Sequence, residues 1–253
     1  VLIAGGVFTY YGVINLGDFL AYMLYVKLFT DPIKKLINFV EQYQNGMTGF
    51  KRFMEIMNVE KEKENPNAVE INNVEGNIEF ENVSFSYPDA GDLSLNNISF
   101  TLKKGEILGI IGGTGSGKST LANLVPRFYD ITSGNLLIDG VDIKEISNKD
   151  LRKIVGFVPQ KGILFSGTID SNIKYGNPNM SDEQMIEAAQ IAQATEFIDS
   201  KPEKYKEPIA QGGSNVSGGQ KQRLSIARAI AIDPEIIVFD DSFSALDFKT
   251  DST

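Results

Sequence analysis

The sequence predicts an α-helical N-terminal segment followed by an α/β domain. Two observations predict this fold class. A helical pattern of apolar residues runs almost unbroken through the first 60 residues, and short apolar stretches typical of strands alternate with helical patterns after residue 77. Between them, the charged and Pro-broken stretch Lys61-Glu62-Lys63-Glu64-Asn65-Pro66-Asn67 is typical of a linker. We therefore divide the chain into a helical segment at 1–60, a linker at 61–76 and an α/β domain at 77–253.

The first part of the helical segment has the composition of a membrane helix. Val1 to Gly17 contain no charged residue, and a second apolar run, Phe19 to Val26, follows Asp18. A free-standing membrane helix needs about 20 apolar residues, so the first run is short, and Gly17-Asp18 is typical of a turn between two helices. The alternative is a buried hydrophobic hairpin in a soluble protein, because charged residues interrupt the pattern.

The second helix is predicted to continue from Phe19 to Met57, with Pro32 as its only kink. At 1.5 Å per residue it would be about 58 Å long, nearly twice the hydrocarbon thickness of a bilayer. Its second half must therefore leave the lipid. The basic residues of that half indicate a cytoplasmic position by the positive-inside bias, and they are Lys34, Lys35, Lys51 and Arg52.

The α/β domain is predicted from short apolar stretches and the helical patterns between them. Alternation of apolar and polar residues predicts half-buried strands around 78–80 and 83–87. A buried strand is predicted at 106–111, because a continuous apolar run there leads into a glycine-rich stretch. Further strands are expected at 97–102, 136–138, 154–158 and 236–239, with helices at 181–194 and 220–232.

The glycine-rich stretch after residue 111 fits the pattern G-x-x-x-x-G-K-[ST] of a phosphate-binding loop. Its glycines let consecutive backbone N–H groups curve around phosphate oxygens, and a helix predicted to begin near Lys118 adds partial positive charge. Lys118 would neutralise the β- and γ-phosphates, and Ser119 would offer a hydroxyl to Mg²⁺. The alternative is a plain turn, which does not require four glycines followed by a lysine and a hydroxyl pair. The predicted phosphate-binding residues are Gly112, Gly113, Thr114, Gly115, Ser116, Gly117, Lys118, Ser119 and Thr120.

Two carboxylates, Asp240 and Asp241, end the apolar strand predicted at 236–239. Proteins with a phosphate-binding loop deliver an acidic group to Mg²⁺ and to the attacking water in this way. The alternative is structural, since buried strands often end in an Asp that caps a helix or a turn. Together with Lys118 and Ser119, the two carboxylates complete a predicted nucleotide site.

A second glycine-containing motif, Ser217-Gly218-Gly219-Gln220, precedes the helix predicted at 220–232. Its structural interpretation is a capping box, in which Ser217 caps the helix and Gln220 reaches back. A capping box does not require two glycines in the first turn, where they weaken a helix. Glycines there allow a ligand to approach the backbone closely, and a phosphate at a helix N-terminus is the natural candidate. A second phosphate-contacting element indicates a site shared between two subunits.

The composition excludes several classes of function. The chain carries 33 acidic and 24 basic side chains, a net charge of -9, so no overall basic surface attracts nucleic acid and we expect no nucleic-acid partner. The absence of cysteine excludes disulfides and thiolate chemistry within these residues, and the absence of histidine removes imidazole as a base or metal ligand. The chain begins without an initiator Met, and we expect a fragment truncated at both ends.

The order of the motifs resembles that of the nucleotide-binding domain of ABC transporters. These motifs are Gly112 to Thr120, Val158-Pro159-Gln160, Asn215 to Arg223 and Phe239 to Asp247. An apolar helical segment precedes them, as in exporters that fuse a permease with an ATPase. The resemblance covers essentially the whole chain. It implies ATP as ligand, Mg²⁺ as cofactor, and a P-loop ATPase domain with a RecA-like core, an antiparallel β subdomain and a helical subdomain.

The resemblance also implies roles for individual residues. Tyr87 would stack on adenine, where the alternative is an ordinary tyrosine at the end of a strand. Gln160 would touch Mg²⁺ or water and relay to the membrane helices, where the alternative is a turn residue after Pro159. Residues 217–220 would contact the γ-phosphate of ATP held by a partner subunit, and residues 244–247 would link the two sites. The implied catalytic residues are Lys118, Gln160 and Asp241, and the implied metal ligands are Ser119, Gln160 and Asp240.

The chain departs from the family pattern at two positions. Asp241 stands where active members carry a glutamate, and Asp is one methylene shorter. A misplacement of about 1 Å can cost about a hundredfold in rate, so we expect this chain's own site to bind ATP tightly and hydrolyse it slowly. The histidine of the switch loop is missing, and truncation after Asp247 explains this better than loss.

We expect the C-terminal part of an exporter half-subunit that pairs with a second half-transporter subunit, most simply as a heterodimer whose partner supplies the glutamate. We expect an integral protein of the plasma or inner membrane, with the ATP-binding domain in the cytoplasm. Its expected partners are the lipid bilayer and an unidentified exported substrate. Two alternatives stay open. One is a nucleotide-binding regulatory subunit without turnover, and the other is a soluble member of the superfamily that acts in DNA repair or translation.

Overall fold

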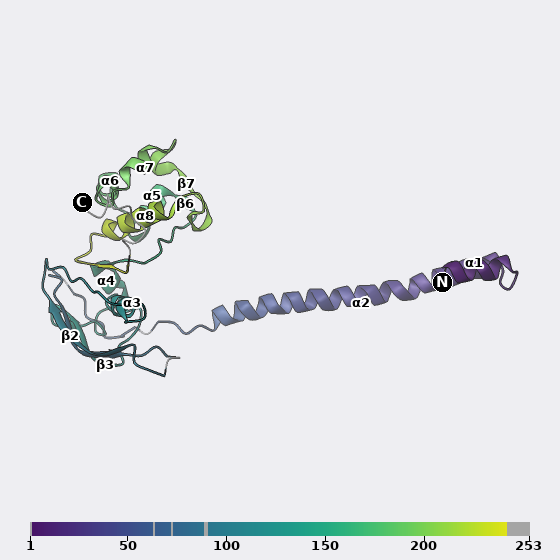
Figure 1. Ribbon diagram of the computed structural model, residues 1–253, viewed down its shortest axis with the longest axis horizontal. Helices are drawn as coiled ribbons and strands as arrows, with labels where there is room; N and C mark the ends of the chain where they lie inside the picture. Colours follow the sequence, from purple (N-terminus) through teal and green to yellow (C-terminus); the bar gives the residue numbers. More distant parts are fainter. Residues whose placement is uncertain (1, 63, 72, 89–90, 242–253) are drawn as a thin grey trace. The chain divides into compact units, whose positions relative to one another are not determined.

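A computed structural model describes residues 2–62, 64–71, 73–88 and 91–241 (Figure 1). The chain separates into two compact units, Val1–Lys63 and Glu64–Thr253. The first unit is helical and the second contains all of the strands of the described chain, as the sequence predicts.

The first unit consists of a short helix and a long one. Helix α1 (Leu2–Tyr10) packs against α2 (Leu16–Met57) through Gly5, where an added Cβ would lie 2.1 Å from the Phe19 ring. The turn predicted at Gly17-Asp18 is wrong, because the two helices are joined by residues 11–15. Asn15 caps α2 by accepting a hydrogen bond from the backbone N–H of Asp18 at 2.7 Å. The Asp18 carboxylate therefore lies in the first turn, where the helix dipole favours negative charge.

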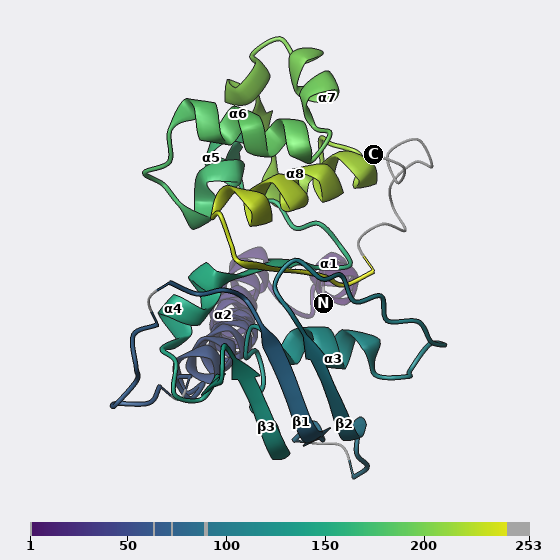
Figure 2. The same cartoon turned by 90° about the vertical axis from the view of Figure 1, so that its left-hand side faces the viewer.

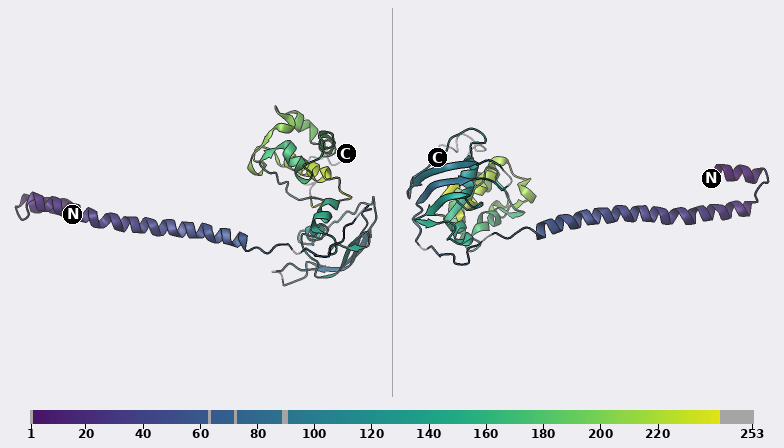
Figure 3. Two further views of the ribbon diagram at one scale, coloured as in Figure 1. Left: turned by 180° about the vertical axis from the view of Figure 1, so that it is seen from behind. Right: turned by 90° about the horizontal axis from the view of Figure 1, so that it is seen from below.

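Helix α2 confirms the long predicted helix. It runs for 42 residues without interruption and continues through Pro32 (Figures 1 and 3). None of its described side chains is buried in this unit. Over residues 2–62 and the rest of the described chain, no helix has both the length and the hydropathy of a membrane span.

The second unit contains an antiparallel sheet with the strand order β2-β1-β3-β4 (Figure 2). The central strand β1 lies between β2 and β3, and Phe80 on β1 stacks on Phe100 of β2 with ring centroids 4.5 Å apart. The strand bounds are β1 (Ile78–Phe85), β2 (Leu95–Leu102), β3 (Ser133–Ile138) and β4 (Val141–Asp142). The two short strands predicted at 78–87 are thus one strand, whose alternation is broken by irregular register between Phe80 and Phe85, with Asn82 at φ 49°.

A second, two-stranded sheet pairs β5 (Val155–Val158) with β8 (Ile236–Phe239) in parallel. Both strands confirm the sequence prediction. Helix α3 (Lys118–Leu124) and helix α4 (Asn148–Ile154) belong to the same unit, and α4 leads directly into β5.

The buried strand predicted at 106–111 is wrong. Residues 103–117 contain no strand, and Ile107 and Ile111 are 97% and 98% exposed. Among the described residues, β5 and β8 pair only with each other, so this apolar run has no ladder partner. Hydrophobicity alone does not make a strand, because the backbone N–H and C=O groups also need a neighbouring strand.

The remaining elements form a helical part (Figure 2). It has its own apolar core, which includes Ile169, Ile198 and Leu224. Helix α6 (Asp182–Ile191) and helix α8 (Gly218–Ala231) confirm the two predicted helices. The other elements are β6 (Gly167–Thr168), α5 (Ile169–Ile173), η1 (Lys174–Gly176), α7 (Thr195–Asp199), η2 (Lys204–Lys206), β7 (Pro208–Ile209) and η3 (Gln211–Gly213).

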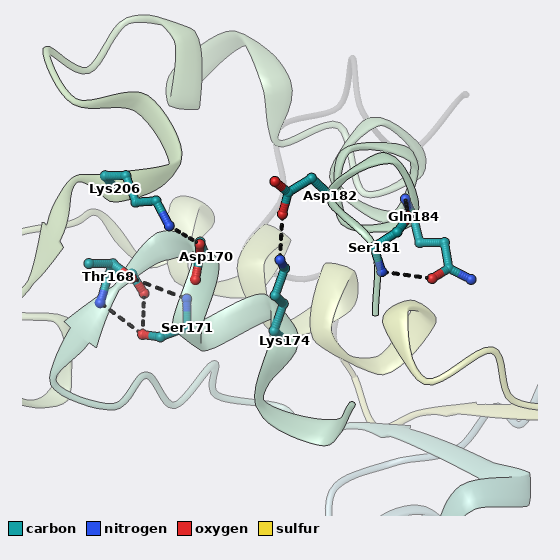
Figure 4. Close-up of polar contacts among 8 residues, drawn as sticks. All are labelled: Thr168, Asp170, Ser171, Lys174, Ser181, Asp182, Gln184 and Lys206. Carbon is teal, nitrogen blue, oxygen red and sulfur yellow. Dashed lines mark hydrogen bonds and ion pairs between the residues drawn. The ribbon is translucent and has the colours of Figure 1, made fainter. Parts of the chain in front are cut away.

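Side chains at the helix starts and two ion pairs connect the segments of the helical part (Figure 4). Capping boxes begin α5 at Thr168 and α6 at Ser181, and each satisfies backbone N–H groups of the first turn. Lys174 of η1 pairs with Asp182 of α6, and the hydrogen bond and charge of Lys174 lower the pKa of Asp182. Lys206 of η2 pairs with Asp170 of α5, which raises the pKa of Lys206.

The turn between β3 and β4 holds the start of the second unit through one carboxylate. Asp139 accepts hydrogen bonds from the backbone N–H groups of Glu75 at 2.7 Å, Gly76 at 3.1 Å and Asn77 at 2.8 Å. The side-chain amide of Asn77 also donates to it at 2.8 Å. Burial raises the pKa of Asp139, but these hydrogen bonds outweigh burial and the pKa is lowered.

We expect Asp139→Asn to lower the free energy of unfolding by about 1 kcal/mol at pH 7, because hydrogen bonds to a charged acceptor are stronger. Asn tolerates the left-handed backbone at this position, where φ is 50°, so the change isolates the charge. The folded-state pKa is depressed, so the carboxylate's contribution is present above the unfolded pKa and is lost as the pH falls through the folded pKa.

Chemical unfolding of both proteins at pH 7 and over an acid series measures this difference. The gap between wild type and variant should close below about pH 4. Glu187→Gln on the exposed face of α6 is the matched control and should show no gap. A gap that is independent of pH would show that the Asp139 charge contributes nothing.

Candidate functional site

The glycine-rich loop at 112–117 is exposed and leads into α3 at Lys118. Gly117 has φ 90°, and an added Cβ would lie 2.8 Å from Leu95 Cδ2 and 2.9 Å from the Ser94 carbonyl. Glycine is therefore required here both by its backbone conformation and by the close approach of β2. No side chain caps α3 at Gly117, so its first N–H groups remain available to an anion.

Lys118 reaches back across this loop. Its ammonium donates hydrogen bonds to the carbonyls of Gly112 and Gly113, both at 2.8 Å. The lysine thus holds the loop curved and places a positive charge beside it. Phosphate oxygens are stronger acceptors than carbonyls, so an anion in the loop would compete for this ammonium.

Ser119 and Asp240 meet, although they lie far apart in the sequence. The Ser119 hydroxyl donates to Asp240 Oδ1 at 2.6 Å, which joins α3 to the end of β8. A hydroxyl and a carboxylate are the hard oxygen ligands that Mg²⁺ prefers. Within the described part of the chain no cluster of three or more acidic or histidine side chains forms a metal site. The pair therefore fits Mg²⁺ only together with phosphate and water oxygens, which is how Mg²⁺ usually binds at nucleotides.

Gln160 and Asp241 also meet. The Gln160 amide donates to Asp241 Oδ2 at 3.0 Å. Gln160 follows β5 and Asp241 follows β8, and the register Val158↔Phe239 brings the carboxyl ends of these parallel strands to one edge. Asp241 has a left-handed backbone, with φ 45°, which turns the chain immediately after Asp240.

Tyr87 is held beside the start of α3. Its hydroxyl lies 3.2 Å from Thr120 Oγ1, and its ring makes edge contacts with Phe85 and Tyr129 at centroid distances of 4.8 Å and 5.1 Å. An aromatic face next to the loop is suited to stacking on a base. The sequence predicts Tyr87 but not Phe85 and Tyr129, whose only signal is an aromatic character shared by many core residues.

Ser217 and Gln220 form the capping box that the structural interpretation predicts. Ser217 Oγ accepts from the Gln220 backbone at 3.3 Å, and Gln220 Oε1 accepts from the Ser217 backbone at 3.0 Å. An added Cβ at Gly218 would meet no atom within 4 Å, so nothing inside the described chain requires glycine there. In the first turn of α8, Gly218 is exposed and Gly219 is half-buried. Capping therefore explains Ser217 and Gln220 but leaves Gly218 unexplained.

The structure thus groups the predicted residues into two places. Around α3 and the ends of β5 and β8, Ser119 pairs with Asp240 and Gln160 pairs with Asp241, while Lys118 begins α3 and bonds to the glycine-rich loop. Residues 217–220 begin α8, and no hydrogen bond between described residues joins them to the loop at 112–120. The predicted linking loop at 244–247 lies outside the described residues.

The family model for ABC transporters matches residues 95–244 of this chain. Curated relatives match almost the whole length of this chain, which corresponds to less than half of their own length. The uncharacterized ABC transporter ATP-binding protein YwjA of Bacillus subtilis is 38% identical over 253 residues, which is 100% of this chain and 44% of that protein. The ATP-dependent lipid A-core flippase of Syntrophus aciditrophicus is 39% identical over 236 residues, which is 93% of this chain and 39% of that protein.

Two further proteins also match most of this chain and are much longer than it. The fatty acid ABC transporter ATP-binding/permease protein of Mycobacterium tuberculosis is 36% identical over 251 residues, which is 99% of this chain and 40% of that protein. The solved structure of a bacterial Atm1-family ABC exporter with ATP bound is similar with a TM-score of 0.73 and 36% identity, covering 83% of this chain and 36% of that one. The chain therefore spans less than half the length of these relatives.

The space around Gly218 leads to a prediction about stability. We expect Gly218→Ala to leave the free energy of unfolding unchanged or to raise it by up to about 1 kcal/mol, because alanine favours the helix and meets no clash. Thermal unfolding measures it, with Gly117→Ala as the contrasting variant that clashes with β2. If Gly218→Ala destabilised the protein by 1 kcal/mol or more, the glycine would be structurally required after all.

Proposed function

Because this chain belongs to the ABC transporter family, we propose that it is the ATP-binding and membrane portion of an ABC exporter, which couples ATP binding and hydrolysis to export of a substrate. The observation that carries the proposal is the pairing of Ser119 with Asp240 and of Gln160 with Asp241 beside the Lys118 loop. These contacts gather a phosphate-binding loop, hard oxygen ligands and a carboxylate at one edge of the β5–β8 sheet.

Each residue has a proposed task in ATP binding. The N–H groups of Gly112 to Thr120 and the Lys118 ammonium hold the phosphates, and Tyr87 stacks on the adenine. Ser119, Asp240 and Gln160 hold Mg²⁺. When bound, Mg²⁺ neutralises charge on the phosphates. Gln160 orients the attacking water, and the Asp241 carboxylate accepts its proton.

A second subunit is proposed to complete the chemistry. Ser217 and Gly218 are exposed at the start of α8, and the room around Gly218 allows the approach of a phosphate held by that subunit. Two half-transporters would then enclose ATP between them, each supplying this motif to the other's site. We propose a heterodimer, because the chain combines an intact motif at 217–220 with the shorter acid Asp241. Such a chain would support hydrolysis at its partner's site better than at its own.

The chain's own site is proposed to hydrolyse ATP slowly. Asp241 is one methylene shorter than the glutamate of active family members, and its carboxylate already accepts the Gln160 amide at 3.0 Å. A shorter carboxylate held by this hydrogen bond lies farther from a water at the phosphate, and proton transfer is sensitive to such displacements.

The proposed location is the plasma or inner membrane, with the ATP-binding domain in the cytoplasm. The uncharged run through residue 17 and the basic residues in the second half of α2 support it. Relatives described as a flippase and as an ATP-binding/permease protein also support it. The exported substrate is unidentified.

A regulatory subunit that binds ATP without turnover is the second candidate function. Asp241 is the observation that favours it, because a site without an effective base can still hold nucleotide and signal its presence. The two candidates share the binding residues and differ only in turnover.

We expect Asp241→Glu to raise the rate of ATP hydrolysis of the full-length assembled protein, and to raise it by about ten- to a hundredfold when the partner's own base has been removed, because the added methylene restores the reach of the base at this chain's site. Steady-state phosphate release measures it, with Asp241→Asn as the matched control, which removes the charge at the same length. The control should hydrolyse no faster than wild type. An unchanged or lower rate in Asp241→Glu would refute the geometric explanation of slow turnover.

A further inference from the structure

Gln222 is a buried polar residue on α8 that no proposed step uses. Its side chain is 1% exposed and lies two residues after Gln220. Its amide donates a hydrogen bond to the carbonyl of Pro159 at 3.1 Å. Burying an amide is costly unless it is hydrogen-bonded, so this bond is what permits glutamine at a core position. The acceptor belongs to the residue immediately before Gln160.

The backbone after Gln160 lies directly against α8. An added Cβ at Gly162 would come within 2.7 Å of the Lys221 carbonyl and within 2.9 Å of the Gln222 backbone nitrogen. Only glycine permits this approach. The loop and the helix are therefore in backbone contact one turn from the exposed motif at 217–220.

Arg228 holds the same loop two turns further along α8. One guanidinium nitrogen donates to the Ile163 carbonyl at 2.8 Å, and the others donate to the backbone and side-chain oxygens of Asn172 at 2.9 Å and 2.8 Å. Asn172, which is 1% exposed, in turn exchanges two hydrogen bonds with the Phe165 backbone, both at 2.9 Å. The guanidinium also lies over the Phe165 ring, 5.2 Å from its centroid.

Three carbonyls in the segment 159–165 are thus held by α8 or by a residue that α8 binds. They belong to Pro159, Ile163 and Phe165. Helix α8 supplies two of these bonds directly, and Asn172 of α5, which Arg228 binds, supplies the third. A rigid connection follows, because the planar guanidinium fork and a buried amide leave few alternative geometries.

We infer that Gln222 and Arg228 are positioning residues that fasten the Gln160 loop to α8, so that Gln160 and residues 217–220 move as one body. A shift of the α8 N-terminus would then move Gln160 relative to Asp241, to which it is hydrogen-bonded at 3.0 Å. This inference rests on the proposed function. In it, the contact between residues 217–220 and a phosphate held by the partner determines the position of Gln160 during hydrolysis. It adds a physical link between two sites that share one helix.

The test compares Gln222→Met with Gln190→Met in the full-length assembled protein. Methionine has a similar volume but no donor, so the first variant breaks the bond to Pro159 without opening a cavity. Gln190 is an exposed glutamine on α6 and serves as the matched control. Arg228→Lys is a second variant, which keeps the charge but loses the planar fork.

Two readouts separate positioning from simple stability. Hydrogen exchange without nucleotide should become about tenfold faster at the amides of residues 160–165 in Gln222→Met, and should not change in β1 to β3. The kcat for ATP hydrolysis at this chain's own site, measured with the partner's base removed, should fall about tenfold while KM stays within about twofold, because the residues that bind ATP are untouched. Gln190→Met should change neither quantity.

The inference is overturned if exchange at 160–165 does not change, or if exchange rises while kcat is unaltered. It is also overturned if kcat and KM change together with a general loss of protection across the unit, which would mark Gln222 as merely structural. If the wild-type protein neither binds nor hydrolyses ATP, the proposed function fails, and the exchange experiment alone decides whether α8 holds the loop.

Discussion

The parallel pairing of β5 with β8 is the interaction on which the candidate site depends. Its register, Val155↔Ile236 to Val158↔Phe239, brings Gln160 and Asp241 to one edge of the sheet, and it places Asp240 where Ser119 at the start of α3 can reach it. A shift of this register by one residue would move each side chain of β8, and the residues that follow it, to the other face of the sheet. Gln160, Asp240 and Asp241 therefore take their positions from one pair of four-residue strands, and Ser119 of α3 joins them through Asp240.

Helix α8 connects this edge to the exposed motif at 217–220. Its first turn carries the capping box, and its buried side holds the Gln160 loop through Gln222 and Arg228. The polar bonds are costly to break because they are buried, whereas the first turn is open around Gly218. The helix is therefore firmly attached on the side of the chain's own site and accessible on the side that a partner would contact.

Local chemistry made much of this predictable from the sequence. The loop before Lys118, the capping box of Ser217 and Gln220, and the strand that ends in Asp240 each follow from residue types at fixed spacing. Long-range features did not. The run at 106–111 is apolar but has no ladder partner among the described residues, and Gln222 finds its acceptor 63 residues away. Such contacts depend on which segments the fold brings together.

ATP hydrolysis by the full-length chain, measured first alone and then with its second subunit, tests the central claim most directly. The account predicts little turnover alone and at least about tenfold more in the pair, because Ser217 to Gln220 complete a site whose base the partner supplies. Removing the partner's base, by changing the acidic residue that follows its own strand-end Asp to Gln, should abolish that gain. Full turnover by the chain alone would contradict the claim that its own site is the slow one.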